Sequence, residues 1–215
     1  MIADGTGFSY NNLYPLVYHR GTSIREVRAH VRVVVLMGIL EDGGRVVLGA
    51  TSGGAYASEV KLLLRMLDSL GEFCDGGYFV ADRCYDSVEV MRKLCEMGIE
   101  PAIRVKQSRH SRVRSELRLR SMKNAKRKEI YGRRYLVESL FGTIKQALSS
   151  HIRVRDAQIA MKFALVRVLL FNLYLFCSLS PRNTAAPLFF VLAAMRWLRR
   201  EIRPLGRRLA CTHPA

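Results

Sequence analysis

Hydrophobic and polar positions recur with two different periods along the first half of the chain. The segment 28–40 is rich in β-branched residues, a turn follows at 41–44, and 45–51 is apolar again, a pattern that predicts a β-hairpin. From 56 to 71 the apolar residues recur at helical spacing and end at a glycine. These segments predict two paired strands followed by a helix.

Strands and helices then alternate. Residues 1–8 are predicted to begin as a short strand that carries Asp4 and to run into a Gly-x-Gly turn. Short apolar strands are also predicted at 76–83 and 100–106, and a helix at 88–98 separates these two. The order along the chain is β, β, β, α, β, α, β. An antiparallel hairpin combined with helix-separated strands indicates an α/β fold with a mixed sheet flanked by helices.

The second half of the chain reads as helices joined by a basic segment. Residues 107–130 are rich in Ser and Arg and poor in apolar residues, which predicts a mobile basic loop. Long helices are predicted at about 133–149 and 156–179, and a third lies within 187–202. The C-terminal part of the protein is therefore expected to be helical.

The charge balance narrows the choice of partners. Thirty-five Lys and Arg against eighteen Asp and Glu give a formal net charge of +17. Such self-repulsion is best tolerated by a protein that binds a polyanion, most often nucleic acid and less often an anionic membrane surface. Residues 101–155 hold sixteen Lys or Arg against three Glu, whereas 41–100 hold eleven of the eighteen acids. This asymmetry suggests a phosphate-binding half and a metal-binding half, unless it reflects unrelated surface faces.

Cysteine usage and hydropathy predict a cytoplasmic protein. The five cysteines form no C-x-x-C pair, and their odd number favours reduced thiols. The apolar runs 168–180 and 185–198 are shorter than the roughly 20 residues that a bilayer requires. No secretory signal is recognised, because Asp4 follows the first three residues. No membrane span is therefore expected.

One predicted helix carries a row of polar side chains. Tyr131, Arg134, Glu138 and Lys145 fall within a sector of about 60° on a helix, and apolar residues occupy another face. A solvated charged face is the ordinary explanation of such a row. A single carboxylate flanked by cations also suits a metal ligand between phosphate-binding groups.

Two further acids are candidates for the same site. Asp4 and Asp82 each follow a short apolar run, which predicts that they lie at the ends of strands. Mg²⁺ prefers oxygen ligands and often takes one or two carboxylates. Taken singly, each acid is equally compatible with ordinary turn chemistry.

Taken together, these motifs resemble the DDE transposases of bacterial and archaeal insertion sequences. DGTGF (4–8) is similar to the segment with their first Asp, and ADRCYDS (81–87) to the segment with the second, although Cys84 replaces a frequent Gly. The helix matches the signature Y-x2-R-x3-E-x6-K at every position. The resemblance extends from about residue 2 to 175 and implies a ribonuclease-H-like catalytic domain over 1–180. Residues 181–215 are then a helical, basic tail.

The resemblance also implies the roles of individual residues. Asp4, Asp82 and Glu138 are the expected catalytic triad and ligands of two Mg²⁺ or Mn²⁺ ions, with Asp86 as the alternative second acid. Arg134 and Lys145 are expected to hold phosphates, and Tyr131 to stack on the DNA end or hydrogen-bond to it. The basic stretch 104–134 is expected to contact the DNA backbone through side chains that include Lys126, Arg127, Lys128 and Arg133.

The implied function is metal-dependent cleavage and strand transfer of an insertion sequence. The partners are transposon ends and target DNA, with a homodimer assembled on DNA in the nucleoid. Alternatives are a ribonuclease-H-like nuclease or resolvase, a non-catalytic DNA-binding remnant and, more remotely, a membrane-surface protein. Full-length relatives carry a segment before the first Asp, whereas Asp4 is almost N-terminal here. An N-terminal truncation is therefore expected, and transposase ancestry is a firmer expectation than present activity.

Overall fold

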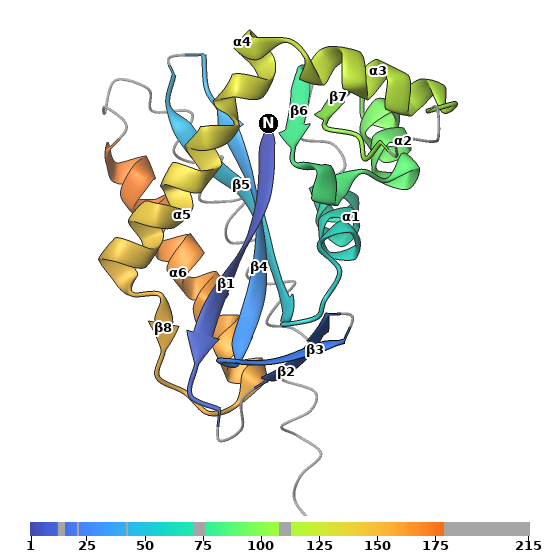
Figure 1. The fold of residues 1–215 in the computed structure, drawn as a ribbon. Helices are drawn as coiled ribbons and strands as arrows, with labels where there is room; N and C mark the ends of the chain where they lie inside the picture. Colours follow the sequence, from blue (N-terminus) through green and yellow to red (C-terminus); the bar gives the residue numbers. More distant parts are fainter. Residues whose placement is uncertain (13–15, 21, 42, 71–75, 108–112, 179–215) are drawn as a thin grey trace, which may run out of the picture.

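The computed structural model describes residues 1–12, 16–20, 22–41, 43–70, 76–107 and 113–178. Within these residues, one mixed sheet has the order β5-β4-β1-β6-β7, and β8 also pairs with β1. Helices cover both faces of this sheet (Figure 1). Its strands are β1 (Ile2–Tyr10), β4 (His30–Ile39), β5 (Arg45–Gly54), β6 (Tyr78–Ala81), β7 (Glu100–Ile103) and β8 (His151–Ile152). The longer helices are α1 (Glu59–Leu70), α2 (Val88–Glu96), α3 (Glu116–Ala125), α5 (Tyr135–Leu148) and α6 (Ala157–Ser178).

Strand β1 is the centre of the sheet. It pairs antiparallel with β4, which in turn pairs antiparallel with β5. On its other side β1 pairs in parallel with β6 near its start and with β8 near its end. The predicted α/β class, with a ribonuclease-H-like mixed sheet flanked by helices, is confirmed.

Two hydrophobic cores lie on the two faces of the sheet. Because side chains alternate along a strand, Ile2 and Phe8 of β1 point to the core that α5 and α6 cover, and Ala3 points to the opposite core. Helices α1 and α2 cover that second core with residues such as Leu63 and Met91. Asp4, at an even position of β1, therefore belongs to the face covered by α5 (Figure 1).

Most predicted elements are found near their predicted positions, with one correction at the first acid. Strand β1 continues to Tyr10, so Asp4 lies inside a strand and not at its end. Unbroken pairing with β4, from Ile2 through Ser9, carries the strand past the two glycines of the DGTGF segment. A small hairpin of β2 (Leu16–Arg20) and β3 (Ser23–Val27) was not predicted. The helix predicted within 187–202 and the tail 181–215 lie outside the described residues.

The prediction of a mobile loop over 107–130 is wrong, because α3 and the short helix α4 (Lys128–Tyr131) lie within it. Polar contacts hold α3 against the edge strand β7. The hydroxyl of Ser121 donates to the carbonyl of Ile103 at 3.0 Å and accepts from its N–H at 2.8 Å. Asn124 donates to the carbonyl of Pro101 at 3.0 Å. The helix thereby covers an edge that would otherwise be open to pairing.

The helix predicted at about 156–179 is confirmed as α6, and the apolar run that begins at residue 168 is its second half. By length and composition alone, the segment Ala157–Leu175, within the described part of the chain, is apolar enough to cross a membrane. Core helices pass the same test. Ala160, Ala164 and Val168 of α6 are buried in the core against the sheet, whereas Phe163 and Leu170 are exposed. Asn172 further ties α6 to both backbone groups of Val47 in β5.

Candidate active site

Two of the predicted acids lie level on adjacent parallel strands. Ile2 of β1 pairs with Val80 of β6, so the register places Asp4 opposite Asp82, directly after the end of β6. Each acid uses one carboxylate oxygen locally. Oδ1 of Asp4 accepts from the N–H of Gly5 at 2.9 Å, and Oδ1 of Asp82 accepts from the N–H of Arg83 at 2.7 Å. The Oδ2 atoms remain for a shared partner.

That shared partner is Arg134. It lies in the short 3-10 helix η2 (Gly132–Arg134), which joins α4 to α5. Its Nη1 atom is 3.6 Å from Oδ2 of Asp4 and 4.0 Å from Oδ2 of Asp82. Its Nη2 atom donates to Oε1 of Glu138, one turn further along the helix. Three carboxylates from β1, β6 and α5 thus converge on one guanidinium group.

Burial and charge act in opposite directions on these groups. Burial is the largest effect on Asp4 and raises its pKa, and the charges of Glu59 and Glu138 add to it. The Gly5 N–H and Arg134 oppose the rise without cancelling it. For Arg134, burial disfavours the charged form, but the attraction of Glu138, Asp4 and Asp82 raises its pKa. At Asp4 the unfavourable effect of burial on the charged form therefore outweighs the favourable contacts with the Gly5 N–H and Arg134.

The raised pKa of Asp4 predicts that its ionisation lowers the stability of the fold. Its pKa is higher in the folded protein than its ordinary value of 3.8, so the ionised carboxylate destabilises the fold at neutral pH. The penalty vanishes once the pH falls below the unfolded value. We expect Asp4→Asn to unfold at higher urea concentration than the wild type at pH 7 in EDTA, with the difference narrowing as the pH approaches 4. A variant less stable than the wild type at pH 7 would contradict this expectation.

Tyr131 and Lys145 extend the site in two directions. The guanidinium of Arg104 stacks over the Tyr131 ring at 4.4 Å from its centroid. Burial raises the pKa of the Tyr131 hydroxyl. Lys145 donates to the hydroxyl of Thr6 at 2.6 Å, and burial lowers its pKa. Arg134 and Lys145 therefore contact the same strand, β1, at Asp4 and at Thr6 two residues later.

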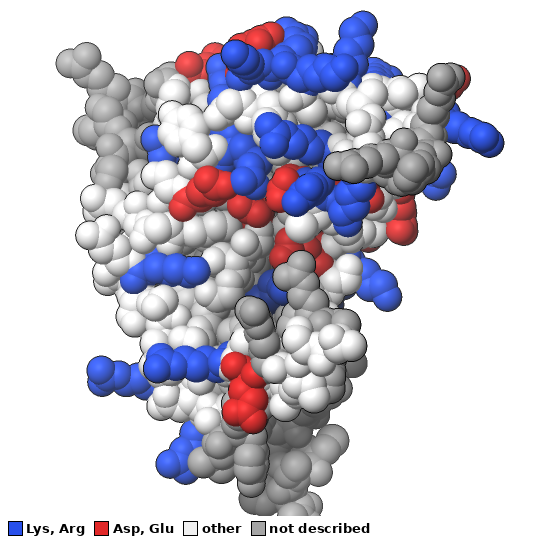
Figure 2. Space-filling model, viewed as in Figure 1, with Lys and Arg blue, Asp and Glu red and all other residues white. Residues whose placement is uncertain are grey.

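The remaining predicted DNA ligands lie on the surface beside the site. Lys126, Arg127, Lys128 and Arg133 are all exposed. Arg127 donates to Glu129 at 2.8 Å and to the hydroxyl of Tyr78 at 3.0 Å. Figure 2 shows basic side chains gathered over α3 and α4, with acidic side chains directly below them. A positive surface therefore borders the carboxylates.

Asp86, the alternative second acid, lies in a different environment. Its side chain is only 2% exposed and accepts from Nε and Nη2 of Arg118 at 3.0 and 2.6 Å. It also accepts from the N–H of Lys106 at 2.8 Å. Both of its oxygens thus link α3 to the turn after β6.

Glu59 is a neighbour of the site that the sequence analysis missed. A Cβ atom on Gly5 would lie 2.8 Å from Cδ of Glu59, so this carboxylate packs directly on the backbone next to Asp4. Strand alternation places it on the opposite face of β1. Arg32 pairs with it at 3.3 Å. Nothing in the sequence distinguishes Glu59 from any acid in the first turn of a helix.

Carboxylate oxygens of this kind are the donors that Mg²⁺ and Mn²⁺ prefer. Among the residues that the structure describes, no three His, Cys, Asp or Glu side chains lie close enough to hold a metal ion in this arrangement. The guanidinium of Arg134 lies between the three acids and already neutralises them in part. The oxygen donors are of the kind that a divalent cation binds, but in this arrangement they surround the guanidinium of Arg134, which marks where positive charge is favoured.

Comparison with known proteins identifies the family of the chain. A family model described as Transposase DDE domain matches residues 2–173, which include Asp4, Asp82 and Glu138. An uncharacterized protein of Aquifex aeolicus (strain VF5) is 35% identical over 182 residues, which cover 83% of this chain and 56% of that relative. The chain thus spans little more than half of the relative's length. No solved structure matches the chain. Since the family match covers most of the sequence, the chain belongs to the family of transposase DDE domains.

Proposed function

We propose that this protein is a DNA transposase that catalyses metal-dependent cleavage and strand transfer of an insertion sequence. The observation that carries the proposal is the convergence of Asp4, Asp82 and Glu138, from three separate elements, on one guanidinium. Membership of the DDE family supports the same reading. If the charged side chains of this segment were only a solvated helix face, the contacts of Arg134 with Asp4 and Asp82 would have no explanation.

In this proposal the three acids hold two Mg²⁺ or Mn²⁺ ions. When bound, such ions activate water or a DNA 3′-hydroxyl and stabilise the leaving oxygen. The chain orients its acids for this task, because the N–H groups of Gly5 and Arg83 each fix one oxygen of Asp4 and Asp82. Arg134 and Lys145 are proposed to hold phosphates beside the cut, and Tyr131, stacked under Arg104, to support the DNA end.

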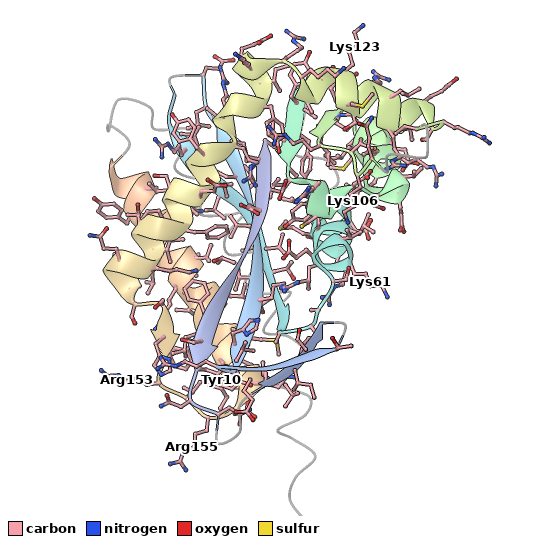
Figure 3. All side chains as sticks on the ribbon, viewed as in Figure 1. Tyr10, Lys61, Lys106, Lys123, Arg153 and Arg155 are labelled. Carbon is pink, nitrogen blue, oxygen red and sulfur yellow. The ribbon has the colours of Figure 1, made fainter. Side chains whose placement is uncertain are left out.

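The proposed DNA path follows the exposed cations. Lys123 projects from α3 at one end of the molecule, and Arg153 and Arg155 project after β8 at the other end (Figure 3). The carboxylate site lies between them, along β1 and α5. Lys126, Arg127, Lys128 and Arg133 are proposed to contact the backbone near the first end. Such contacts are independent of sequence and weaken with salt.

The proposed partners are transposon ends and target DNA. Joining two ends calls for two active sites, so we propose a homodimer assembled on DNA. The net charge of +17 favours association with the nucleoid in the cytoplasm. These assignments concern the assembled protein on DNA.

A joining assay with pre-cut terminal-repeat duplexes and Mn²⁺ tests the proposal. The wild-type protein is expected to join the 3′ ends to a target plasmid. Nicking without joining would favour the nuclease or resolvase alternative, which uses the same carboxylates. DNA binding with neither reaction would favour a non-catalytic binding protein.

A further inference from the structure

Arg134 lies where a positive ion would be expected to lie. Its two terminal nitrogens approach Oδ2 of Asp4, Oδ2 of Asp82 and Oε1 of Glu138. The Oδ1 atoms of both aspartates accept hydrogen bonds from backbone N–H groups. The Oδ2 atoms of the aspartates and Oε1 of Glu138, which contact the guanidinium, are oxygens of the kind that a metal ion also binds.

Without this guanidinium the three carboxylates would repel one another. Nη1 of Arg134 lies 3.6 Å from Oδ2 of Asp4 and 4.0 Å from Oδ2 of Asp82, and Nη2 donates to Oε1 of Glu138. The guanidinium therefore offsets part of this repulsion when no other cation is present.

Arg134 is in contact with solvent as well as with the acids. Its side chain is 24% exposed, and the next residue before it, Arg133, is exposed on the same helical segment. A planar guanidinium binds a phosphate through two parallel hydrogen bonds as well as it binds a carboxylate. A DNA phosphate is therefore a chemically equivalent partner.

We propose that Arg134 is an internal counter-ion that competes with the divalent cation for Asp4, Asp82 and Glu138 and exchanges these acids for a DNA phosphate when the cation binds. The inference rests on the proposed function, because it takes these acids as the metal ligands. Its consequence is that cation and DNA bind cooperatively. A bound cation displaces Arg134 from the acids and frees it for a DNA phosphate. Bound DNA holds Arg134 away from the acids and leaves them free for the cation.

Mn²⁺ titration of the DNA-free protein, followed by the electron paramagnetic resonance signal of free Mn²⁺, tests the competition. Arg134→Gln is expected to bind Mn²⁺ on the order of tenfold more tightly than the wild type, because the competing charge is gone. Arg134→Lys keeps the charge but loses the planar pair of guanidinium donors, so its Mn²⁺ affinity should lie between those of the wild type and Arg134→Gln. Unchanged or weaker binding by Arg134→Gln would overturn the inference.

Arg133→Gln is the matched control for charge alone. Arg133 precedes Arg134 and its side chain is exposed, so the substitution removes the same positive charge from the neighbouring position. We expect its Mn²⁺ affinity without DNA to stay within about twofold of the wild type. A gain equal to that of Arg134→Gln would show a general charge effect and would overturn the inference. If Arg134→Gln does not give a native circular dichroism spectrum, the comparison of Arg134→Lys with the wild type decides in the same way.

The experiment separates this inference from the proposed function. Asp82→Asn is expected to lose most Mn²⁺ binding if the acids are metal ligands. Binding that does not depend on Asp82 would overturn the proposed function and, with it, the inference. Binding that depends on Asp82 but is the same in Arg134→Gln overturns the inference alone. A short DNA duplex should tighten Mn²⁺ binding by the wild type more than by Arg134→Gln, and equal coupling in both proteins would contradict the exchange.

Discussion

Replacing Glu138 with Gln is expected to lower the rate of strand joining by on the order of a thousandfold or more. The side chains are nearly the same size, so the helix and its hydrogen bond from Arg134 can be retained. The substitution removes one of the three negative charges that the proposed site uses to hold its cations. Initial rates of joining of pre-cut ends, measured with Mn²⁺, give the loss directly.

Binding and a matched glutamate complete this test. Glu138→Gln is expected to bind DNA in EDTA at least as tightly as the wild type, because it removes a charge that repels phosphate. Glu89→Gln makes the same chemical change at an exposed position on α2 and should leave the joining rate unaltered. Joining by Glu138→Gln at the wild-type rate would remove Glu138 from the catalytic machinery.

Replacing Arg118 with Ala is expected to destabilise the fold by about 3 kcal/mol or more. Asp86 is 2% exposed, and Arg118 donates two hydrogen bonds to it. Without Arg118 the buried carboxylate keeps only the N–H of Lys106, and an uncompensated buried charge is costly. Urea denaturation at pH 7 measures the loss. This pair ties α3 to the turn after β6, and Leu117 of α3 also packs against the second core.

A second arginine on the same helix is the control. Arg120 pairs with Glu100, but their side chains are 55% and 33% exposed. Water screens such a pair, so Arg120→Ala should destabilise the fold much less than Arg118→Ala. Equal losses for the two variants would mean that burial of Asp86 does not set the strength of the Arg118 contact.

The elements that the sequence predicted well are those with strong periodicity. Strands β4 and β5 are found near 28–40 and 45–51, and α1 lies within 56–71. Their apolar residues face large cores, so the burial that stabilises them is visible as a repeat of two or of 3.6 residues. The row predicted on one helix is divided among three elements, with Tyr131 in α4, Arg134 in η2 and Glu138 in α5, although Arg134 still bonds to Glu138 four residues later.

Helix α3 shows why other elements were missed. Of its residues, Ser121 is the buried one, and the contacts that hold it are hydrogen bonds and ion pairs to β7 and to Asp86. Polar partners distant in sequence leave no apolar repeat to detect, so the segment 107–130 resembled a loop. The β2–β3 hairpin is a two-stranded sheet of its own, and its short strands carry little core pattern.

By itself, the sequence determined the α/β class and the positive charge, since these depend on local spacing and on composition. Only the tertiary structure decided that Asp4 lies within β1 level with Asp82, that Asp86 is tied to Arg118, and that Arg134 lies among three carboxylates. The physical reason is the separation of the interacting residues along the chain. Periodicity reports which side of an element is buried, whereas strand register and ion pairs join residues far apart, such as Arg134 and Asp4 at 130 positions, and leave no repeat in the sequence.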